Sequence, residues 1–228
     1  VACGSDNAAF ITDEGMLVVA FDGKEHQLCR ADELKIHGLH NASNALAASV
    51  AAIVLGVSDD VVVSALRSFA PLEHRIEPCG SINGVACFND SKATNVDATL
   101  KALTAFPNAR PIVLLGGDDK GTDLSDLVRE VYKHARAAVC FGAAADRFLQ
   151  AFSENGTDQP EGFLLLSASN MGSALDAALD VAQSGDVVLL SPACASFDEF
   201  HSFEERGTVF KRLVSERSGA VSAAFNVR

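Results

Sequence analysis

Seven consecutive residues, 89–95, carry the side chains that are best suited to bind a ligand. They read Asn-Asp-Ser-Lys-Ala-Thr-Asn and stand between an apolar run at 85–88 and a helix-like segment at 96–103. A carboxylate, a lysine and several hydroxyl or amide groups would therefore share one strand-to-helix turn. In an open α/β sheet such a turn binds ligands, because helix N–H groups point out of it. The sequence thus predicts a ligand site in which Asp90 and Lys92 supply the charges.

Two further segments that follow apolar runs have the composition of ligand loops. Residues 116–121 read Gly-Gly-Asp-Asp-Lys-Gly, in which glycines would let backbone N–H groups converge on an anion while Lys120 adds a charge. Residues 191–198 read Ser-Pro-Ala-Cys-Ala-Ser-Phe-Asp, and their small residues and hydroxyls permit close approach of a ligand. The alternatives are an ordinary glycine turn and a tight turn. The glycine run is neither a dinucleotide-binding motif nor a P-loop.

Two asparagines and one arginine stand out elsewhere. Asn41 and Asn44 are three residues apart at a predicted helix start, so their carboxamides would share a face and could match the edge of adenine. Either side chain could instead cap the helix. Arg75 lies in a predicted hinge between Phe69 and Pro78, where it could form a surface salt bridge or reach a phosphate across a cleft.

The pattern of apolar residues predicts a first part made of strands followed by two helices. Residues 1–36 alternate short apolar runs with turns, as antiparallel strands do. Apolar residues at helical spacing predict one helix over 41–55 and a second from Ser58 to Pro71. Residues 1–77 would form this part.

After Pro78, strands and helices alternate. The sequence predicts a hairpin over 79–88, helices over 96–103, 125–136, 144–152 and 171–183, strands over 111–115, 137–141, 163–167 and 186–191, and a last helix through Phe210 and Leu213. Short, continuously apolar strands are typical of a parallel sheet that is covered on both faces. The fold class expected for residues 78–228 is α/β, a Rossmann-like, doubly wound and mostly parallel sheet.

Charge and cysteine content narrow the class of protein. The formal net charge of -12 argues against binding to nucleic acid or to an anionic membrane surface. The longest apolar stretch, 45–57, is too short to span a bilayer, and no secretory leader is recognised. Six scattered cysteines form no metal-binding pair and favour reduced thiols in a cytoplasmic protein. A Rossmann-like protein that uses Cys194 as a nucleophile is a further hypothesis.

Five motifs together resemble those of the Mur ligases. In chain order they are Gly38-x-His40-Asn41-x-x-Asn44-Ala45, Glu73-His74-Arg75, the run at 89–95, Gly116-Gly117-Asp118-x-Lys120 and Leu190-Ser191-Pro192-Ala193-Cys194-Ala195-Ser196. The resemblance extends through nearly all 228 residues. The run at 89–95 is similar to that of the branch adding D-glutamate, and differs from branches that add L-alanine, a diamino acid or D-Ala-D-Ala.

The resemblance implies an ATP-dependent, ADP-forming amide ligase of peptidoglycan synthesis in the cytoplasm. ATP would phosphorylate the carboxylate of UDP-N-acetylmuramoyl-L-alanine, and the amine of D-glutamate would attack the resulting acyl phosphate. Residues 1–77 would form the C-terminal part of a central ATP-binding domain of α/β ATPase type. Residues 78–228 would form the C-terminal, amino-acid-binding domain.

The resemblance also implies a role for individual residues. The ATP-binding set would be Asn41, Asn44, Arg75, Asp90 and Lys92, with Asp90 and Lys92 also catalytic. The set that binds the amino acid would be Thr94, Lys120, Ser196, Phe197 and Phe203. Lys120 would neutralise one carboxylate of a doubly acidic substrate, while hydroxyls and loop N–H groups fix its orientation. Phe203 could instead face the core, as could Phe200 and Phe210.

The chain departs from the family in what it lacks. It contains no G-x-x-G-K-[ST] loop, so we expect it to be part of a longer protein. We expect that protein to be a monomer. Its Mg²⁺ ligands would lie upstream and not in these residues. The chain alone would then bind D-glutamate or nucleotide without ligating them. A family member specific for a different amino acid is the other alternative.

Overall fold

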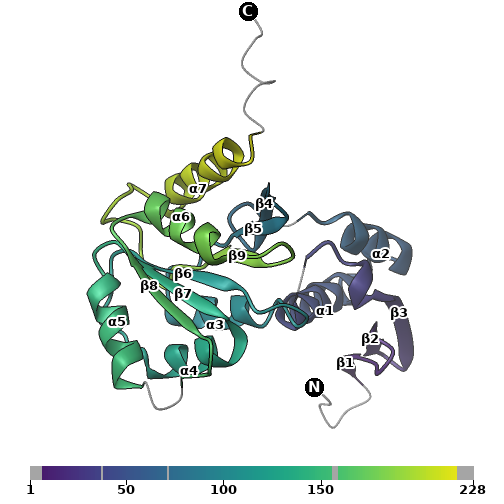
Figure 1. Ribbon diagram of the computed structural model, residues 1–228. Helices are drawn as coiled ribbons and strands as arrows, with labels where there is room; N and C mark the ends of the chain where they lie inside the picture. The colour runs from purple at the N-terminus through teal and green to yellow at the C-terminus, as the bar shows by residue number, and fades with distance from the viewer. Residues whose placement is uncertain (1–6, 37, 71, 156–158, 220–228) are drawn as a thin grey trace, which may run out of the picture. The chain divides into compact units, whose positions relative to one another are not determined.

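The chain forms two compact units, residues 1–71 and residues 72–228 (Figure 1). The computed structural model describes residues 7–36, 38–70, 72–155 and 159–219. The boundary predicted from sequence falls later, between residues 77 and 78. Residues 72–77 group with the second unit because they bond there: Glu77 accepts a hydrogen bond from Asn89 Nδ2 at 3.1 Å, and Ile76 packs against Leu189.

The first unit is a three-stranded antiparallel sheet with two helices, as the sequence predicts. Its elements are β1 (Ala8–Ile11), β2 (Met16–Phe21), β3 (Lys24–Arg30), a 3-10 turn (Ala31–Glu33), α1 (Leu39–Val54) and α2 (Asp59–Ser68). The strands lie in the order β1-β2-β3, and Asp22 and Gly23, both with positive φ, turn the chain between β2 and β3. The predicted end of the second helix, Pro71, lies outside the described residues.

The core of the first unit lies between the sheet and the helices. Leu17 and Val19 of β2 face the same side and pack with Leu46 and Ile53 of α1 and with Val62 of α2. The spacing of Leu46 and Ile53 is helical, and the spacing of Leu17 and Val19 is that of a strand. Apolar periodicity therefore accounts for this unit.

The second unit is a six-stranded sheet with helices on both faces. Its elements are β4 (Glu77–Ile82), β5 (Val85–Asn89), α3 (Val96–Leu103), β6 (Ile112–Gly116), α4 (Ser125–His134), β7 (Ala137–Phe141), α5 (Ala145–Glu154), β8 (Leu164–Ala168), α6 (Met171–Val181), β9 (Val187–Leu190) and α7 (Phe203–Arg217). The strand order is β4-β5-β9-β6-β7-β8 (Figure 1). Only β4 runs antiparallel to its neighbour. The predicted doubly wound, mostly parallel α/β sheet is confirmed.

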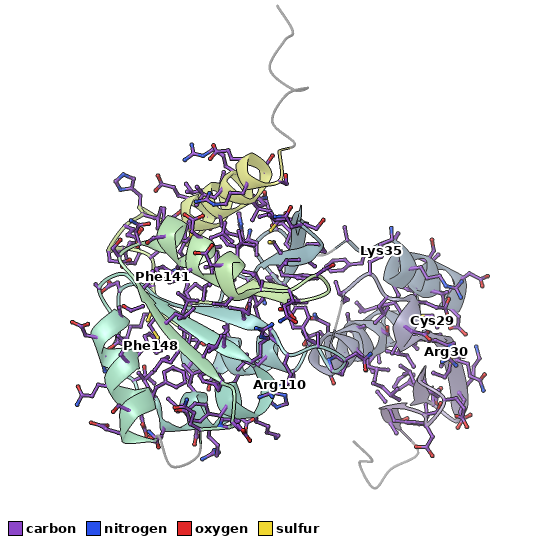
Figure 2. The ribbon with its side chains drawn as sticks, in the orientation of Figure 1. Cys29, Arg30, Lys35, Arg110, Phe141 and Phe148 are labelled. Carbon is purple, nitrogen blue, oxygen red and sulfur yellow. The ribbon has the colours of Figure 1, made fainter. Side chains whose placement is uncertain are left out.

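Alternate residues of the central strands pack into two hydrophobic cores, one on each face of the sheet. On β6, Val113 and Leu115 pack with α3, α4 and α5, whereas Ile112 and Leu114 pack with α6 and α7. Figure 2 labels one phenylalanine from each core: Phe148 of α5 belongs to the first, and Phe141 of β7 to the second. This two-sided burial explains why the strands are continuously apolar. None of the described helices combines the length and apolarity needed to cross a membrane.

Candidate functional site

Three loops at the carboxyl ends of neighbouring strands form the candidate site. We call residues 89–95 the β5 loop, residues 116–121 the β6 loop and residues 191–198 the β9 loop. Strand β9 lies between β5 and β6 and runs parallel to both. The three polar strand ends therefore share one edge of the sheet. Ligands of open α/β sheets bind at this edge.

The β5 and β9 loops are joined by buried hydrogen bonds. The Asp90 N–H donates to Leu190 O at 2.8 Å, which extends the β5–β9 ladder by one step. Ser191 Oγ donates to Asp90 Oδ2 at 2.8 Å, and both residues are buried. The Asp90 carboxylate is thus held by the neighbouring strand.

Burial changes the acidity of Asp90. Burial raises the pKa of its carboxyl to about 7, and the hydrogen bonds from Ser191 Oγ and Ile76 N–H together with the charge of Arg75 only partly oppose this rise. Near neutral pH this carboxyl is therefore partly protonated. A group with that property at a ligand edge is suited to a catalytic or binding role.

The β6 and β9 loops pair as a short antiparallel bridge. The Asp118 N–H donates to Ala195 O and the Ala195 N–H donates to Asp118 O, each at 3.0 Å, while the Gly116 N–H donates to Pro192 O at 3.0 Å. A Cβ at Gly117 would lie 2.3 Å from Ala195 O, so this close approach requires glycine. The expectation that the glycine run presents its N–H groups to an anion is thus wrong for Gly116 and Asp118, because their N–H groups are already bonded.

The side chain of Arg206, on α7, ties these loops together. It is 0% exposed, and its Nε donates to Ser91 Oγ at 2.9 Å. Its Nη1 and Nη2 groups donate to backbone carbonyls of Ala195, Ser91 and Cys194 at 2.9 to 3.1 Å. Burial lowers the pKa of this guanidinium to about 10, so it stays charged at neutral pH. Arg206 acts as the common anchor of the β5 and β9 loops.

Sequence reasoning missed Arg206, although a signal was available. In the string Glu204-Glu205-Arg206 it looks like part of a solvated charged face. Yet Arg206, Phe210 and Val214 follow each other at intervals of four and are all buried. An arginine in register with an apolar helix stripe is therefore the signal to look for.

Lys92 and Phe203, two predicted site residues, are in direct contact. Lys92 Nζ lies 3.8 Å from the centre of the Phe203 ring, a cation–π contact. The Phe203 ring also contacts the His74 ring edge-on, with 6.1 Å between the two ring centres. Phe203 is only half-buried, whereas Phe210 is fully buried in the core, so the two do not share the same role. Thr94 is also half-buried, on the same loop as Lys92.

The remaining predicted residues of the amino-acid set lie on the other two loops. Lys120 and Phe197 are exposed, and Phe197 is 70% exposed, which is unusual for a large apolar side chain. Ser196 is 2% exposed, so direct contact of its hydroxyl with a ligand requires the β9 loop to shift. The structure thus brings all five residues of this set to one edge but presents them to solvent unequally.

Two helix starts near this edge are occupied by carboxylates of the chain itself. Asp198 Oδ2 accepts a hydrogen bond from the Ala143 N–H at 3.1 Å, just before α5. Glu199 Oε2 accepts one from the Met171 N–H at 3.3 Å, at the start of α6. Because these N–H groups already face carboxylates, an anionic ligand is favoured nearer to the β5, β9 and β6 loops.

Asn41 and Asn44 lie on α1 in the first unit. Asn44 Nδ2 donates to Asn41 Oδ1 at 3.5 Å, so the carboxamides share one face as predicted. The alternative that either residue caps the helix is wrong: α1 begins at Leu39 and its N-cap is Gly38. Arg75, in the second unit, is exposed, and its charge lowers the pKa of Asp90.

The structure does not favour Cys194 as a nucleophile. Its side chain is 1% exposed, and burial raises the pKa of the thiol to about 12. The reactive species is the thiolate, which is scarce at that pKa. The five described cysteines are unpaired, and Cys3 lies outside the described residues. Among the described residues, no group of three or more His, Cys, Asp or Glu side chains is placed to hold a metal ion.

The fold and its joined loops define a Rossmann-like ligand-binding domain. Residues 74–194 match the family described as "Mur ligase, glutamate ligase domain". This match covers more than half of the chain, and the chain belongs to the Mur ligase family. The resemblance seen in the five motifs is thereby confirmed.

Individual relatives narrow the comparison. The chain is 42% identical over 201 residues to a UDP-N-acetylmuramoylalanine--D-glutamate ligase of Pelotomaculum thermopropionicum, covering 88% of this chain and 43% of that protein. It is 46% identical over 189 residues to the ligase of that name from Solibacter usitatus, covering 82% and 41%. Its fold resembles that of E. coli FolC solved with DHPP and ADP, with a TM-score of 0.64 and 18% identity over 94% of this chain and 47% of that chain. The chain spans less than half the length of these relatives.

Proposed function

We propose that the complete protein containing this chain is an ATP-dependent ligase that joins D-glutamate to UDP-N-acetylmuramoyl-L-alanine in the cytoplasm, as a monomer. The relatives of that name and the family match support this reaction. The observation that carries it here is the meeting of the β5, β9 and β6 loops, which gathers Lys92, Thr94, Lys120 and Ser196 at one sheet edge. Lys120 beside hydroxyl groups suits a carboxylate of a small dicarboxylate, and Lys92 suits the phosphates of a nucleotide at the same edge.

The amino-acid site, in this proposal, is formed by all three loops. Lys120 neutralises one carboxylate of D-glutamate, and Thr94 and Ser196 accept or donate hydrogen bonds that fix the orientation of the molecule. Phe197 and Phe203 would shield it from water, because exposed or half-buried rings beside a polar site exclude solvent when a ligand binds. Holding the amine close to an activated carboxyl carbon is the main catalytic contribution of such a site.

The nucleotide would contact a different set of residues. The paired amides of Asn41 and Asn44 offer both a donor and an acceptor, as the edge of adenine requires. Arg75 and Lys92 are exposed cations suited to phosphates, and Asp90 is a buried carboxyl with a hydrogen bond to Ser191. When bound, ATP supplies the phosphoryl group that activates the acceptor carboxylate. The E. coli protein of similar fold was solved with ADP. As the family resemblance implies, we propose that the residues that hold Mg²⁺ belong to the part of the complete protein outside this chain.

The test is ADP release by the complete protein in the presence of UDP-N-acetylmuramoyl-L-alanine and one amino acid at a time. D-glutamate should stimulate release, whereas L-alanine and diaminopimelate should not. Stimulation by diaminopimelate alone would assign the protein to another branch of the family, and absence of any stimulation would contradict the proposal. The isolated chain should release no ADP under the same conditions, because it contains no phosphate-cradling G-x-x-G-K-[ST] loop.

A further inference from the structure

An arginine from outside the three loops holds the tip of the β6 loop. Arg147, on α5, donates from Nη1 to Asp119 Oδ2 at 2.6 Å, and from Nη2 to the backbone carbonyl of Thr122. The Gly121 N–H donates to the same Asp119 oxygen at 3.0 Å. One side chain thus bonds to residues on both sides of Lys120.

The base of the β6 loop is fixed independently of this arginine. Asp118 pairs with Ala195 of the β9 loop, so the backbone up to Asp118 is held by the sheet. Beyond that point, the loop is held by the hydrogen bonds from Arg147 to Asp119 and Thr122 and by the turn at Gly121. Because Lys120 stands between Asp119 and Gly121, a clamp on its neighbours limits where its ammonium group can lie.

The ion pair between Arg147 and Asp119 also neutralises the negative charge beside Lys120. Asp119 is a carboxylate that is only 17% exposed in its side chain, directly next to a lysine proposed to bind a dicarboxylate. Left unpaired, it would repel that substrate and attract the Lys120 ammonium. The Arg147 guanidinium, at 2.6 Å, offsets this charge.

We propose that Arg147 is a positioning residue for the amino-acid substrate: through Asp119 and Thr122 it holds Lys120 in place and cancels the Asp119 charge. This inference rests on the proposed function, since it takes Lys120 as a contact of D-glutamate. Arg147 itself need not touch the substrate.

The experiment measures kcat and the KM values for D-glutamate and for ATP with the complete protein. Arg147→Ala should raise the KM for D-glutamate about 10- to 100-fold, because a displaced binding group costs that much, while the KM for ATP changes little. Asp119→Ala should raise it less, because no bare carboxylate remains. The double variant Arg147→Ala, Asp119→Ala should have the same KM for D-glutamate as Asp119→Ala. Removing Asp119 should therefore lower the KM that Arg147→Ala raised.

The control is Arg217→Ala, at the end of α7, where the hydrogen bonds of this side chain go to residues of α6 and α7 and not to a loop of the site. Arg217 also binds a carboxylate, that of Asp176, and a carbonyl oxygen, that of Gly172. The Arg217→Ala variant should have the wild-type KM for D-glutamate. If Arg147→Ala does not fold, Arg147→Lys serves instead, because it keeps the charge but lacks the planar fork that places separate nitrogens on the two partners, and it too should raise this KM.

Two results would overturn the inference while the wild-type protein remains active. The first is that the KM for D-glutamate of Arg147→Ala, or of Arg147→Lys if that variant is used, stays within twofold of the wild-type value. The other is a loss of kcat alone, which partial unfolding would produce without a positioning role. A wild-type protein without D-glutamate-dependent ADP release would instead refute the proposed function, and this inference with it.

Discussion

Replacing Arg206 by methionine tests the anchor of the β5 and β9 loops. Methionine has a comparable length but no donor, so the carbonyl oxygens of Ser91 and Cys194 lose the partner that Arg206 provides. Ala195 O keeps the N–H of Asp118, so we do not count it. Two unsatisfied buried oxygens at about 1–3 kcal/mol each give about 2–6 kcal/mol. Removing a buried charge offsets part of this loss, and we expect Arg206→Met to lower the free energy of unfolding by about 2–4 kcal/mol.

The assay can report on the second unit alone. The chain has one tyrosine and no tryptophan, and Tyr132 is buried in the core formed by α3, α4 and α5. Urea unfolding followed by tyrosine fluorescence therefore measures the free energy of unfolding of that unit.

The matched control is Arg217→Met on the same helix. Arg217 is 25% exposed in its side chain and pairs with Asp176 at the surface, so its loss should cost less than about 1 kcal/mol. If Arg206→Met were no less stable than this control, the anchoring role of Arg206 would be wrong.

Two further predictions concern the same unit. Gly207→Ala should destabilise this unit by about 1–3 kcal/mol in urea unfolding, because the new Cβ would lie 2.2 Å from Nδ1 of the buried His74. The control Gly172→Ala should change the free energy of unfolding by less than about 1 kcal/mol, because its Cβ meets only one atom within 3.4 Å. Equal effects of the two substitutions would contradict the packing argument. The pKa of Asp90 is raised by burial from 3.8 to about 7 in the folded chain, so folding takes up a proton between these pH values. The unfolding free energy of wild type relative to Asp90→Asn should therefore fall by up to about 1.4 kcal/mol per pH unit from pH 4 to 7 and level off above; a difference independent of pH would rule out the raised pKa.

The fold of the second unit could be predicted well because its signals are local. Continuous apolar runs such as 137–141 become strands buried on both faces, and the Asn83-Gly84 turn becomes the β4–β5 hairpin. The start of α1 was predicted too late, because its N-cap is Gly38 and not a polar side chain. Local patterns locate elements, and they leave the exact first turn of a helix less certain when no side chain caps it.

The candidate site was predicted in outline, and its supports were not. The three loops could be found because each is a polar run directly after an apolar strand. Arg206 was overlooked, although its spacing with the buried Phe210 and Val214 was a signal of its burial. Arg147 could not be found, because it is distant in sequence from the β6 loop and a charged residue on a helix usually faces water. The bonded N–H groups of Gly116 and Asp118 were missed for the same reason, since their acceptors lie on the β9 loop.

A crystal structure of the complete protein with ADP and D-glutamate tests the central claim most directly. We predict that D-glutamate lies among the β5, β9 and β6 loops, with one carboxylate in ion-pair contact with Lys120 and a hydroxyl contact to Thr94. D-glutamate bound away from these loops, or bound there with Lys120 turned into solvent, would contradict the account.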